Sequence, residues 1–203
     1  RGYWDPLSAI AVRVLTTDPH EDIDAAFFER KVRQALESRH QLIDFKGLHY
    51  LIDAAHLLRA RPLTVLMAGT GDRRDALAAQ ARHLGLEDRV RLLGKRDDVQ
   101  ALLAASDLFV CPSVWDEALG NVILEAMAWG LPIVTTPVFG IREQVREDVN
   151  GVFYAPGDVA ALADALARLA TDDALRARLA GNAVPALDAL TDFDAMVEAY
   201  GRI

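Results

Sequence analysis

The amino-acid sequence predicts an α/β fold in which helices cover both faces of a parallel sheet, giving three layers. Short apolar runs alternate with longer amphipathic stretches along the chain, a pattern typical of βα units. Several runs are apolar at every position, as in Leu108–Cys111, which is typical of strands buried on both faces. Turn residues stand where the two patterns meet: Gly69 and Gly71 follow one run, and Asp72 is placed to cap the next helix.

Taken in chain order, each expected strand is a short apolar run and each expected helix is an amphipathic stretch behind a turn. The expected strands span residues 9–16, 63–68, 90–93, 108–111, 131–136 and 151–154. The expected helices span residues 21–37, 48–59, 73–84, 99–104, 122–128, 142–147, 159–169, 172–190 and 194–200. Because helices separate them in the sequence, the strands at 63–68, 108–111 and 131–136 are expected to be parallel neighbours in one sheet.

Composition and charge restrict the classes of protein to which this chain can belong. The chain has 203 residues, 52% of them hydrophobic, so it can bury a substantial core. Asp and Glu number 30 and Lys and Arg 22, and the net charge of −8 argues against a nucleic-acid-binding or anionic-membrane-binding surface while leaving room for a small basic pocket. The single cysteine, Cys111, excludes an intramolecular disulfide and is typical of a reducing compartment. No apolar run reaches the roughly 20 residues of a membrane span. We therefore expect a soluble, cytoplasmic protein, and the missing initiator Met predicts a fragment or a processed chain.

Residues 112–132 carry the most chemical information. This segment follows a buried strand, passes through an irregular loop and enters a helix near Gly120 and Asn121. Free backbone N–H groups at the start of a helix bind anions, and a glycine lets a ligand approach the backbone closely. Glu117 stands in the loop, and Glu125 follows eight positions later inside the helix. Carboxylates accept hydrogen bonds from adjacent hydroxyl groups, so the pattern predicts a site for a polyhydroxylated ligand at the carboxyl end of a strand.

A plainer interpretation of these residues stays open. Acidic side chains in the first turns of a helix stabilise the helix dipole, and Glu117 beside Asp116 can simply be solvated. Other chemistries have little support, because the five histidines show no metal-ligand spacing and neither a Gly-x-Ser-x-Gly elbow nor a Walker A loop is present. The run Gly69-Thr70-Gly71 lacks the third glycine of a dinucleotide-binding fingerprint, so an NAD-dependent enzyme is not indicated.

The segment that begins Glu117-Ala-Leu-Gly120 and continues Glu125-Ala-Met-Ala-Trp-Gly-Leu-Pro132 resembles a known signature. It is similar to the Glu-x7-Glu motif of retaining nucleotide-sugar glycosyltransferases of group one (family four), which have the GT-B fold. The resemblance covers residues 39–203 and implies the Rossmann-like, donor-binding C-terminal half of such an enzyme. Residues 41–203 would form this nucleotide-sugar-binding domain, and residues 1–40 a strand and helix packed on it. Further motifs match in the same order: Phe45-Lys-Gly-Leu48, Leu51-Ile-Asp-Ala-Ala55, Ala68-Gly-Thr-Gly-Asp72, Leu92-Leu-Gly94, Leu102-Leu-Ala-Ala-Ser-Asp107 and Pro112-Ser113.

The resemblance also implies roles for individual residues. Glu117 would contact hydroxyl groups of the donor sugar, and Glu125 the ribose of the nucleotide. A cationic pair, Arg39 and Lys46, would clamp the diphosphate in the role that a bound metal fills in other enzymes, so no metal cofactor is expected. The family has a hydrophobic strand ending in Gly-Arg before the Lys-Gly, whereas residues 32–39 are polar, helix-prone and lack the glycine. The remaining implied contacts are the backbone of Leu119, Gly120, Asn121 and Val122 facing the sugar and diphosphate, Gly71 in a turn near the nucleotide, and Arg96 in the loop that resembles the base-binding segment.

The implied function is that of the donor-binding domain of a retaining, metal-independent glycosyltransferase, which transfers a sugar from a nucleoside diphosphate to an acceptor hydroxyl. The expected partners are the nucleotide-sugar and an N-terminal acceptor domain, because 203 residues cannot hold both Rossmann-like domains. A second copy of the chain is a further candidate partner, and the chain by itself is expected to be inactive. Two alternatives stay open: a non-catalytic nucleotide or nucleotide-sugar binding module, as in a truncated or engineered half-enzyme, and a fragment of a GT-B-like epimerase or phosphorylase.

Overall fold

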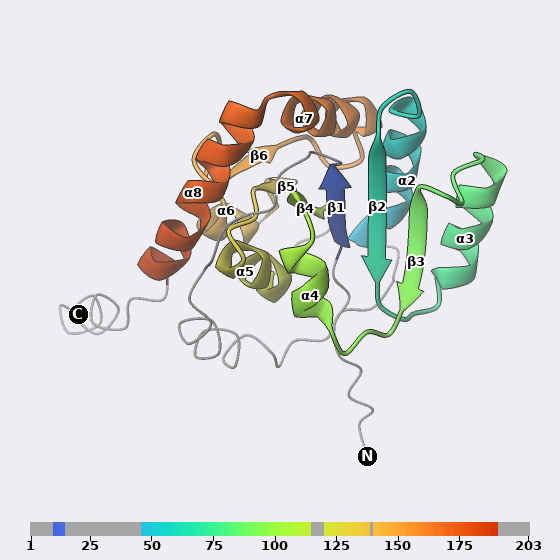
Figure 1. Ribbon diagram of the computed structural model, residues 1–203, viewed down its shortest axis with the longest axis horizontal. Helices are drawn as coiled ribbons and strands as arrows, with labels where there is room; N and C mark the ends of the chain where they lie inside the picture. Colours follow the sequence, from blue (N-terminus) through green and yellow to red (C-terminus); the bar gives the residue numbers. More distant parts are fainter. Residues whose placement is uncertain (1–9, 15–45, 115–119, 139, 191–203) are drawn as a thin grey trace, which may run out of the picture.

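A six-stranded sheet forms the centre of the structure, in the strand order β3-β2-β1-β4-β5-β6 (Figure 1). The computed structural model describes residues 10–14, 46–114, 120–138 and 140–190. Parallel pairing joins β2 to β3, β4 to β5 and β5 to β6, whereas β1 pairs antiparallel with both β2 and β4. The carboxyl ends of β2 to β6 therefore lie at one edge of the sheet. In the described residues the strands are β1 (Ile10–Val14), β2 (Leu63–Ala68), β3 (Val90–Gly94), β4 (Leu108–Cys111), β5 (Ile133–Thr135) and β6 (Gly151–Phe153).

Helices cover both faces of the sheet. On one face, α2 (Leu48–Leu57) packs against α3 (Arg74–His83) and α7 (Val159–Thr171). The other face carries α4 (Val99–Ala104), α5 (Asn121–Ala128) and α6 (Ile141–Gln144). The long helix α8 (Asp173–Leu190) packs against both α7 and α5 and runs along the β6 side of the sheet (Figure 1).

Strand β4 shows how the sheet divides the core. All four of its residues are buried. Leu108 and Val110 belong to the apolar cluster that includes residues of α2 and α7, while Phe109 and Cys111 belong to the cluster that includes residues of α5. Successive side chains of a strand point to opposite faces, so this strand lies between two helix layers. The predicted three-layer, Rossmann-like α/β fold is confirmed.

One predicted neighbour relation is wrong. β2 and β4 run in the same direction, but β1 lies between them and is antiparallel to both. The sequence predicts a strand at residues 9–16 without fixing its direction, because an apolar strand pattern reads the same in either direction along the chain. The predicted parallel pairing of β4 with β5 is confirmed.

The helices lie close to their predicted positions. α6 is shorter than predicted and ends at Gln144, because the backbone of Val145 is extended (φ −112°, ψ 134°). The helices predicted at 21–37 and 194–200 lie outside the described residues. Across the described ranges, no helix combines the length and the apolar character needed to cross a bilayer.

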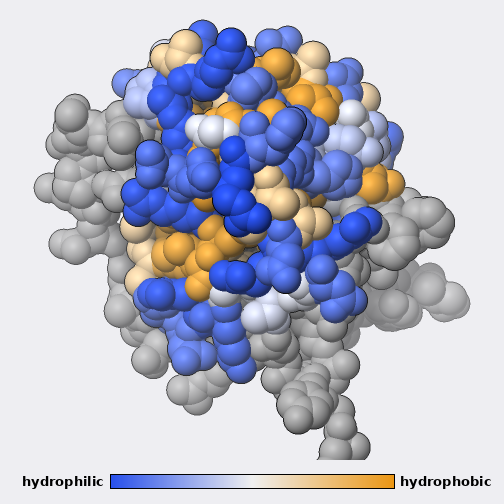
Figure 2. All heavy atoms as spheres, turned by 90° about the vertical axis from the view of Figure 1, so that its right-hand side faces the viewer, coloured by the Kyte–Doolittle hydropathy of each residue, from blue (hydrophilic) through white to orange (hydrophobic). Residues whose placement is uncertain are grey.

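β3 forms an edge of the sheet, and its side of the molecule faces the viewer in Figure 2. Hydrophilic residues dominate that face, and hydrophobic residues form separate patches. Arg91 within β3 is exposed. A charged residue on an edge strand disfavours pairing with the edge of another sheet, so β3 is protected against this kind of association.

Candidate functional site

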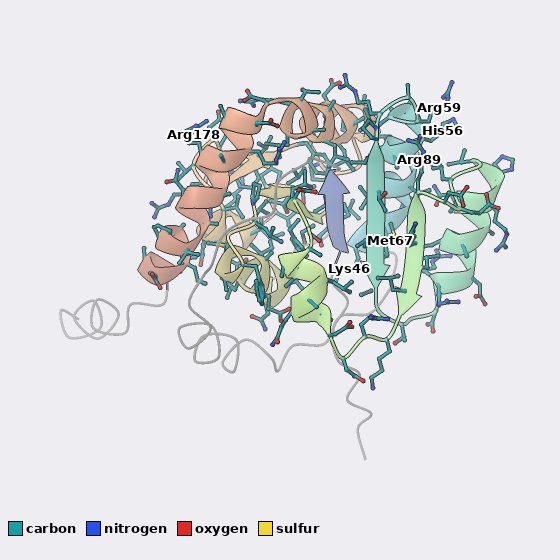
Figure 3. The ribbon with its side chains drawn as sticks, viewed as in Figure 1. Lys46, His56, Arg59, Met67, Arg89 and Arg178 are labelled. Carbon is teal, nitrogen blue, oxygen red and sulfur yellow. The ribbon has the colours of Figure 1, made fainter. Side chains whose placement is uncertain are left out.

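The candidate site lies at the edge of the sheet where β2 to β6 end. In an α/β sheet, ligands bind outside the carboxyl ends of the strands, because the loops and helix starts that follow them converge there. Figure 3 shows Lys46 near the carboxyl end of β2, whereas His56, Arg59 and Arg89 lie at the opposite edge. The predicted lysine of the diphosphate clamp is thus on the expected side of the sheet.

A glycine turn fixes the position of Lys46. The next residue, Gly47, has a left-handed backbone (φ 64°) and immediately precedes α2. A Cβ at this position would overlap the carbonyl oxygen of Pro112, the residue that follows β4. Only glycine meets both requirements, so the close approach of the two backbones places Lys46 beside the chain that leaves β4.

Two threonine hydroxyls hold the chain after β4 in place. The hydroxyl of Thr135 donates to the carbonyl oxygen of Cys111 at 2.8 Å, and that of Thr136 donates to the carbonyl oxygen of Ser113 at 2.5 Å. Ser113 and both threonines are buried. These bonds tie the end of β4 to the end of β5, so the segment leading to Gly120 starts from a fixed position.

The start of α5 has the features of an anion site. Gly120 is the N-cap residue, with φ −81° and ψ 81°, and no side chain caps the helix. Among the described residues, no backbone carbonyl accepts from the N–H groups of Asn121 and Val122. The aligned peptide dipoles also place partial positive charge at this end of the helix. The helix start predicted at Gly120 and Asn121 is therefore confirmed, with its first donors free to bind a ligand.

Glu125 is buried one turn farther along α5. Only 5% of its surface is exposed, and its Oε1 atom has no hydrogen-bond partner in the described part of the chain. Burial raises its pKa from the ordinary value of 4.5 to about 8, so the carboxyl group is neutral at pH 7. Helical side chains lean toward the N-terminus of their helix, which directs this group toward the free N–H groups of α5. A neutral carboxyl group both donates and accepts, so it can bind a pair of adjacent hydroxyls.

The stability of the protein should fall as the pH rises from about 5 to about 8. Unfolded, Glu125 ionises near pH 4.5, whereas in the folded chain it keeps its proton to about pH 8, so the folded state binds more protons in this window. The associated loss is on the order of 3–5 kcal/mol. Urea unfolding at several pH values measures it, with Glu125→Gln as the control, because glutamine stays neutral and should flatten the slope. Equal slopes for both proteins would contradict the raised pKa of the buried Glu125 carboxyl.

Gly71 and Arg96 follow β2 and β3 at the same edge. Gly71 has φ 149° and Gly69 φ 140°, so both use backbone conformations that favour glycine in the turn after β2. The Arg96 guanidinium donates to both carboxylate oxygens of Asp98, at 2.7 and 2.6 Å. This pair raises the pKa of Arg96 and lowers that of Asp98. Arg96 thus lies in the loop after β3, with its side chain bound to a neighbouring carboxylate, and its role in base binding stays a prediction.

Three predicted site residues, Arg39, Glu117 and Leu119, lie outside the described residues. Gln144 is a residue that the sequence does not single out, yet it lies at this site: it is buried, and its Oε1 atom is 3.3 Å from where a Cβ on Gly120 would be. The only signal was a polar residue next to the apolar Val145 in a short predicted helix. In the described ranges, no three His, Cys, Asp or Glu side chains lie together as metal ligands would.

Comparison with known proteins identifies the family to which this chain belongs. The profile of the family described as glycosyl transferases group 1 matches residues 38–172, which include the Lys46 turn and all of α5. The chain belongs to this family. Among its relatives is the lipopolysaccharide core biosynthesis glycosyltransferase LpsE of Rhizobium meliloti, 38% identical over 160 residues, which are 79% of this chain and 46% of LpsE.

Two solved structures, one of them an isolated C-terminal domain, are similar to this group 1 chain. The Anabaena protein HepE, in complex with UDP-glucose, is 28% identical with a TM-score of 0.71, and the match covers 90% of this chain and 54% of HepE. The C-terminal domain of a group 1 glycosyl transferase, LpcC, from Francisella tularensis is 25% identical with a TM-score of 0.66, over 74% of this chain and 82% of that domain. The chain spans less than half the length of LpsE and of other curated relatives, and it corresponds to a C-terminal, GT-B-type domain.

Proposed function

We propose that this chain is the donor-binding domain of a retaining, metal-independent glycosyltransferase that uses a nucleoside diphosphate sugar. The observation that carries the proposal is the start of α5, where free N–H groups, the neutral carboxyl of Glu125 and the nearby turn of Lys46 meet at one edge of the sheet. These groups complement a diphosphate next to a diol. The binding of UDP-glucose by HepE, a structural relative, supports this class of ligand.

In the proposed reaction, the positive groups of the site stabilise the departing nucleoside diphosphate. Lys46 supplies a full charge, and the first N–H groups of α5 supply fixed dipoles that need no rearrangement as negative charge develops. Arg39 is the second cation of the proposed clamp and Glu117 the contact to the donor sugar. The acceptor hydroxyl attacks the anomeric carbon on the face that the diphosphate leaves, the glycosidic bond to the diphosphate breaks, and a diphosphate oxygen takes the acceptor proton. The described residues need only bind and neutralise the leaving group.

The acceptor is proposed to be held by a separate N-terminal domain. All described helices and strands from Lys46 to Leu190 belong to one sheet and its two helix layers. Residues 41–203, together with strand β1 (Ile10–Val14), which lies between β2 and β4, are therefore proposed as the nucleotide-sugar half of a two-domain enzyme, and the acceptor half forms the opposite wall of the cleft.

Replacing Glu125 tests the nucleotide site. Calorimetry with UDP, GDP, ADP and their common sugar conjugates identifies the preferred ligand, and Glu125→Ala should then weaken its binding by roughly 1–3 kcal/mol, about 5- to 150-fold, through loss of hydrogen bonds to the ribose. The 2′,3′-dideoxy form of the same nucleotide is the matched control, because the variant should bind it as well as the wild type does. An unchanged affinity of folded Glu125→Ala for the ribonucleotide would remove Glu125 from the site.

A further inference from the structure

The side chain of Gln144, the last residue of α6, is buried without a hydrogen-bond partner among the described residues. Only 2% of its surface is exposed, and neither Nε2 nor Oε1 has a hydrogen-bond partner among the described residues. Its backbone carbonyl, by contrast, accepts from Nδ2 of Asn150 at 3.1 Å. Buried amides are nearly always hydrogen-bonded, because an unpaired amide loses the bonds that water would make. We therefore expect this amide to bind a partner that the described residues do not supply.

The neighbouring Asn150 shows that this part of the fold can satisfy a buried amide. Besides the bond to Gln144, its Nδ2 contacts Sδ of Met127 at 3.8 Å, and its Oδ1 accepts from the backbone N–H of Arg146 at 2.7 Å. Asn150 is fully buried, like Gln144. The two amides differ in that Asn150 makes hydrogen bonds within the fold, whereas neither polar atom of the Gln144 side chain has a partner among the described residues.

The side chain of Gln144 lies next to the start of α5. Its Oε1 atom lies 3.3 Å from the place of a Cβ on Gly120, the N-cap of α5. Because residue 120 is a glycine, it places no side chain of its own against the carboxamide, and the other neighbour of this point is Cδ1 of Ile123 at 3.1 Å. An unpaired buried amide and the unpaired N–H groups of Asn121 and Val122 thus occur together within the described residues.

The chemistry of a carboxamide selects among the groups of a nucleotide-sugar. Phosphate oxygens at neutral pH mainly accept hydrogen bonds, so a phosphate would satisfy Nε2 of Gln144 and leave Oε1 unpaired. A hydroxyl group both donates and accepts, so neighbouring hydroxyls can satisfy both atoms. The hydroxyl groups closest to a diphosphate held at the start of α5 belong to the transferred sugar.

We propose that Gln144 is a specificity-determining residue, whose carboxamide donates to and accepts from hydroxyl groups of the transferred sugar. The inference rests on the proposed function, because it assumes that the start of α5 holds the diphosphate of a nucleotide-sugar. It adds a residue from α6 to a site otherwise built from the Lys46 turn before α2, the turns after β2 to β4, and α5.

The test compares the wild-type chain with Gln144→Met, which keeps the length of the side chain and removes both polar atoms. Calorimetry measures both proteins against UDP and UDP-glucose, GDP and GDP-mannose, and ADP and ADP-glucose. For the pair that the wild type binds most tightly, Gln144→Met should keep its affinity for the diphosphate within about twofold and lose about tenfold for the sugar conjugate. Equal changes for both ligands, including no change for either, would overturn the proposal.

Thermal unfolding separates a role in binding from a role in folding. Gln144→Met should keep or raise the melting temperature, because it removes an unpaired buried amide, whereas the matched change Asn150→Leu should lower it by breaking three contacts. A drop in Gln144→Met as large as in Asn150→Leu would make Gln144 a structural residue and overturn the proposal. If the wild type binds none of the six ligands, the proposed function itself fails, a result visible before any variant is compared.

Discussion

The 203-residue chain, incubated with a nucleotide-sugar and an acceptor alcohol, is expected to bind the donor but to transfer sugar at least a thousandfold more slowly than when the acceptor domain is supplied. Holding the acceptor within about 3–3.5 Å of the reacting carbon can supply roughly 7–11 kcal/mol of the barrier. The described residues build the donor side alone, because their strands and helices are used by one sheet and its covering layers. An open cleft also leaves the anomeric carbon in water, so hydrolysis competes with transfer.

A radiolabelled donor measures this difference. The chain is assayed alone and together with a separately expressed N-terminal half of a group 1 relative, with product separated from free sugar to distinguish transfer from hydrolysis. Transfer that appears only with the second domain fits the proposed half-enzyme. Rapid transfer by the chain alone would contradict it, and donor binding without transfer in either mixture would favour the non-catalytic binding module.

Lys46→Ala is expected to weaken the binding of a nucleoside diphosphate by roughly 10- to 150-fold while changing the binding of the nucleoside far less. A hydrogen bond to a charged group contributes about 1.5–3 kcal/mol, and the nucleoside lacks the charge that Lys46 would neutralise. Lys46 is suited to this role because the Gly47 turn against Pro112 fixes its backbone at the carboxyl end of β4.

Isothermal calorimetry with the diphosphate and the nucleoside of the same base gives the two losses. Arg59→Ala is the matched control, because it removes one positive charge from the opposite edge of the sheet, where Figure 3 places Arg59. The control should bind both ligands as the wild type does, apart from a small change that salt removes. Losses of the same size for nucleoside and diphosphate in Lys46→Ala would contradict the clamp.

Local patterns in the sequence were enough to predict the elements that build the site. Strand β4 could be recognised because a strand covered on both faces is apolar at every position, and the start of α5 because Gly120 interrupts the loop just before an apolar helix. The direction of β1 could not be predicted, because the pleat gives an apolar strand the same pattern in both directions.

Features that depend on contacts between distant residues could also not be predicted from the sequence. The bond from Thr136 to Ser113 and the approach of Gly47 to Pro112 join residues far apart in the sequence. Glu125 was predicted as a carboxylate, and only its burial shows that it is neutral at pH 7. Gln144 looked like an ordinary polar residue of a short helix, because nothing in the sequence reveals that its amide is buried without a partner among the described residues.

A crystal structure of this chain with its preferred nucleoside diphosphate, grown in the presence of EDTA, would show where the nucleotide binds and whether a metal accompanies it. We predict that the diphosphate binds the N–H groups of Asn121 and Val122 with Lys46 beside it, that the ribose lies against Glu125, and that no metal lies between protein and ligand. A nucleotide bound at the opposite edge of the sheet, near Arg59 and Arg89, or one whose diphosphate lies away from the start of α5, would contradict this prediction.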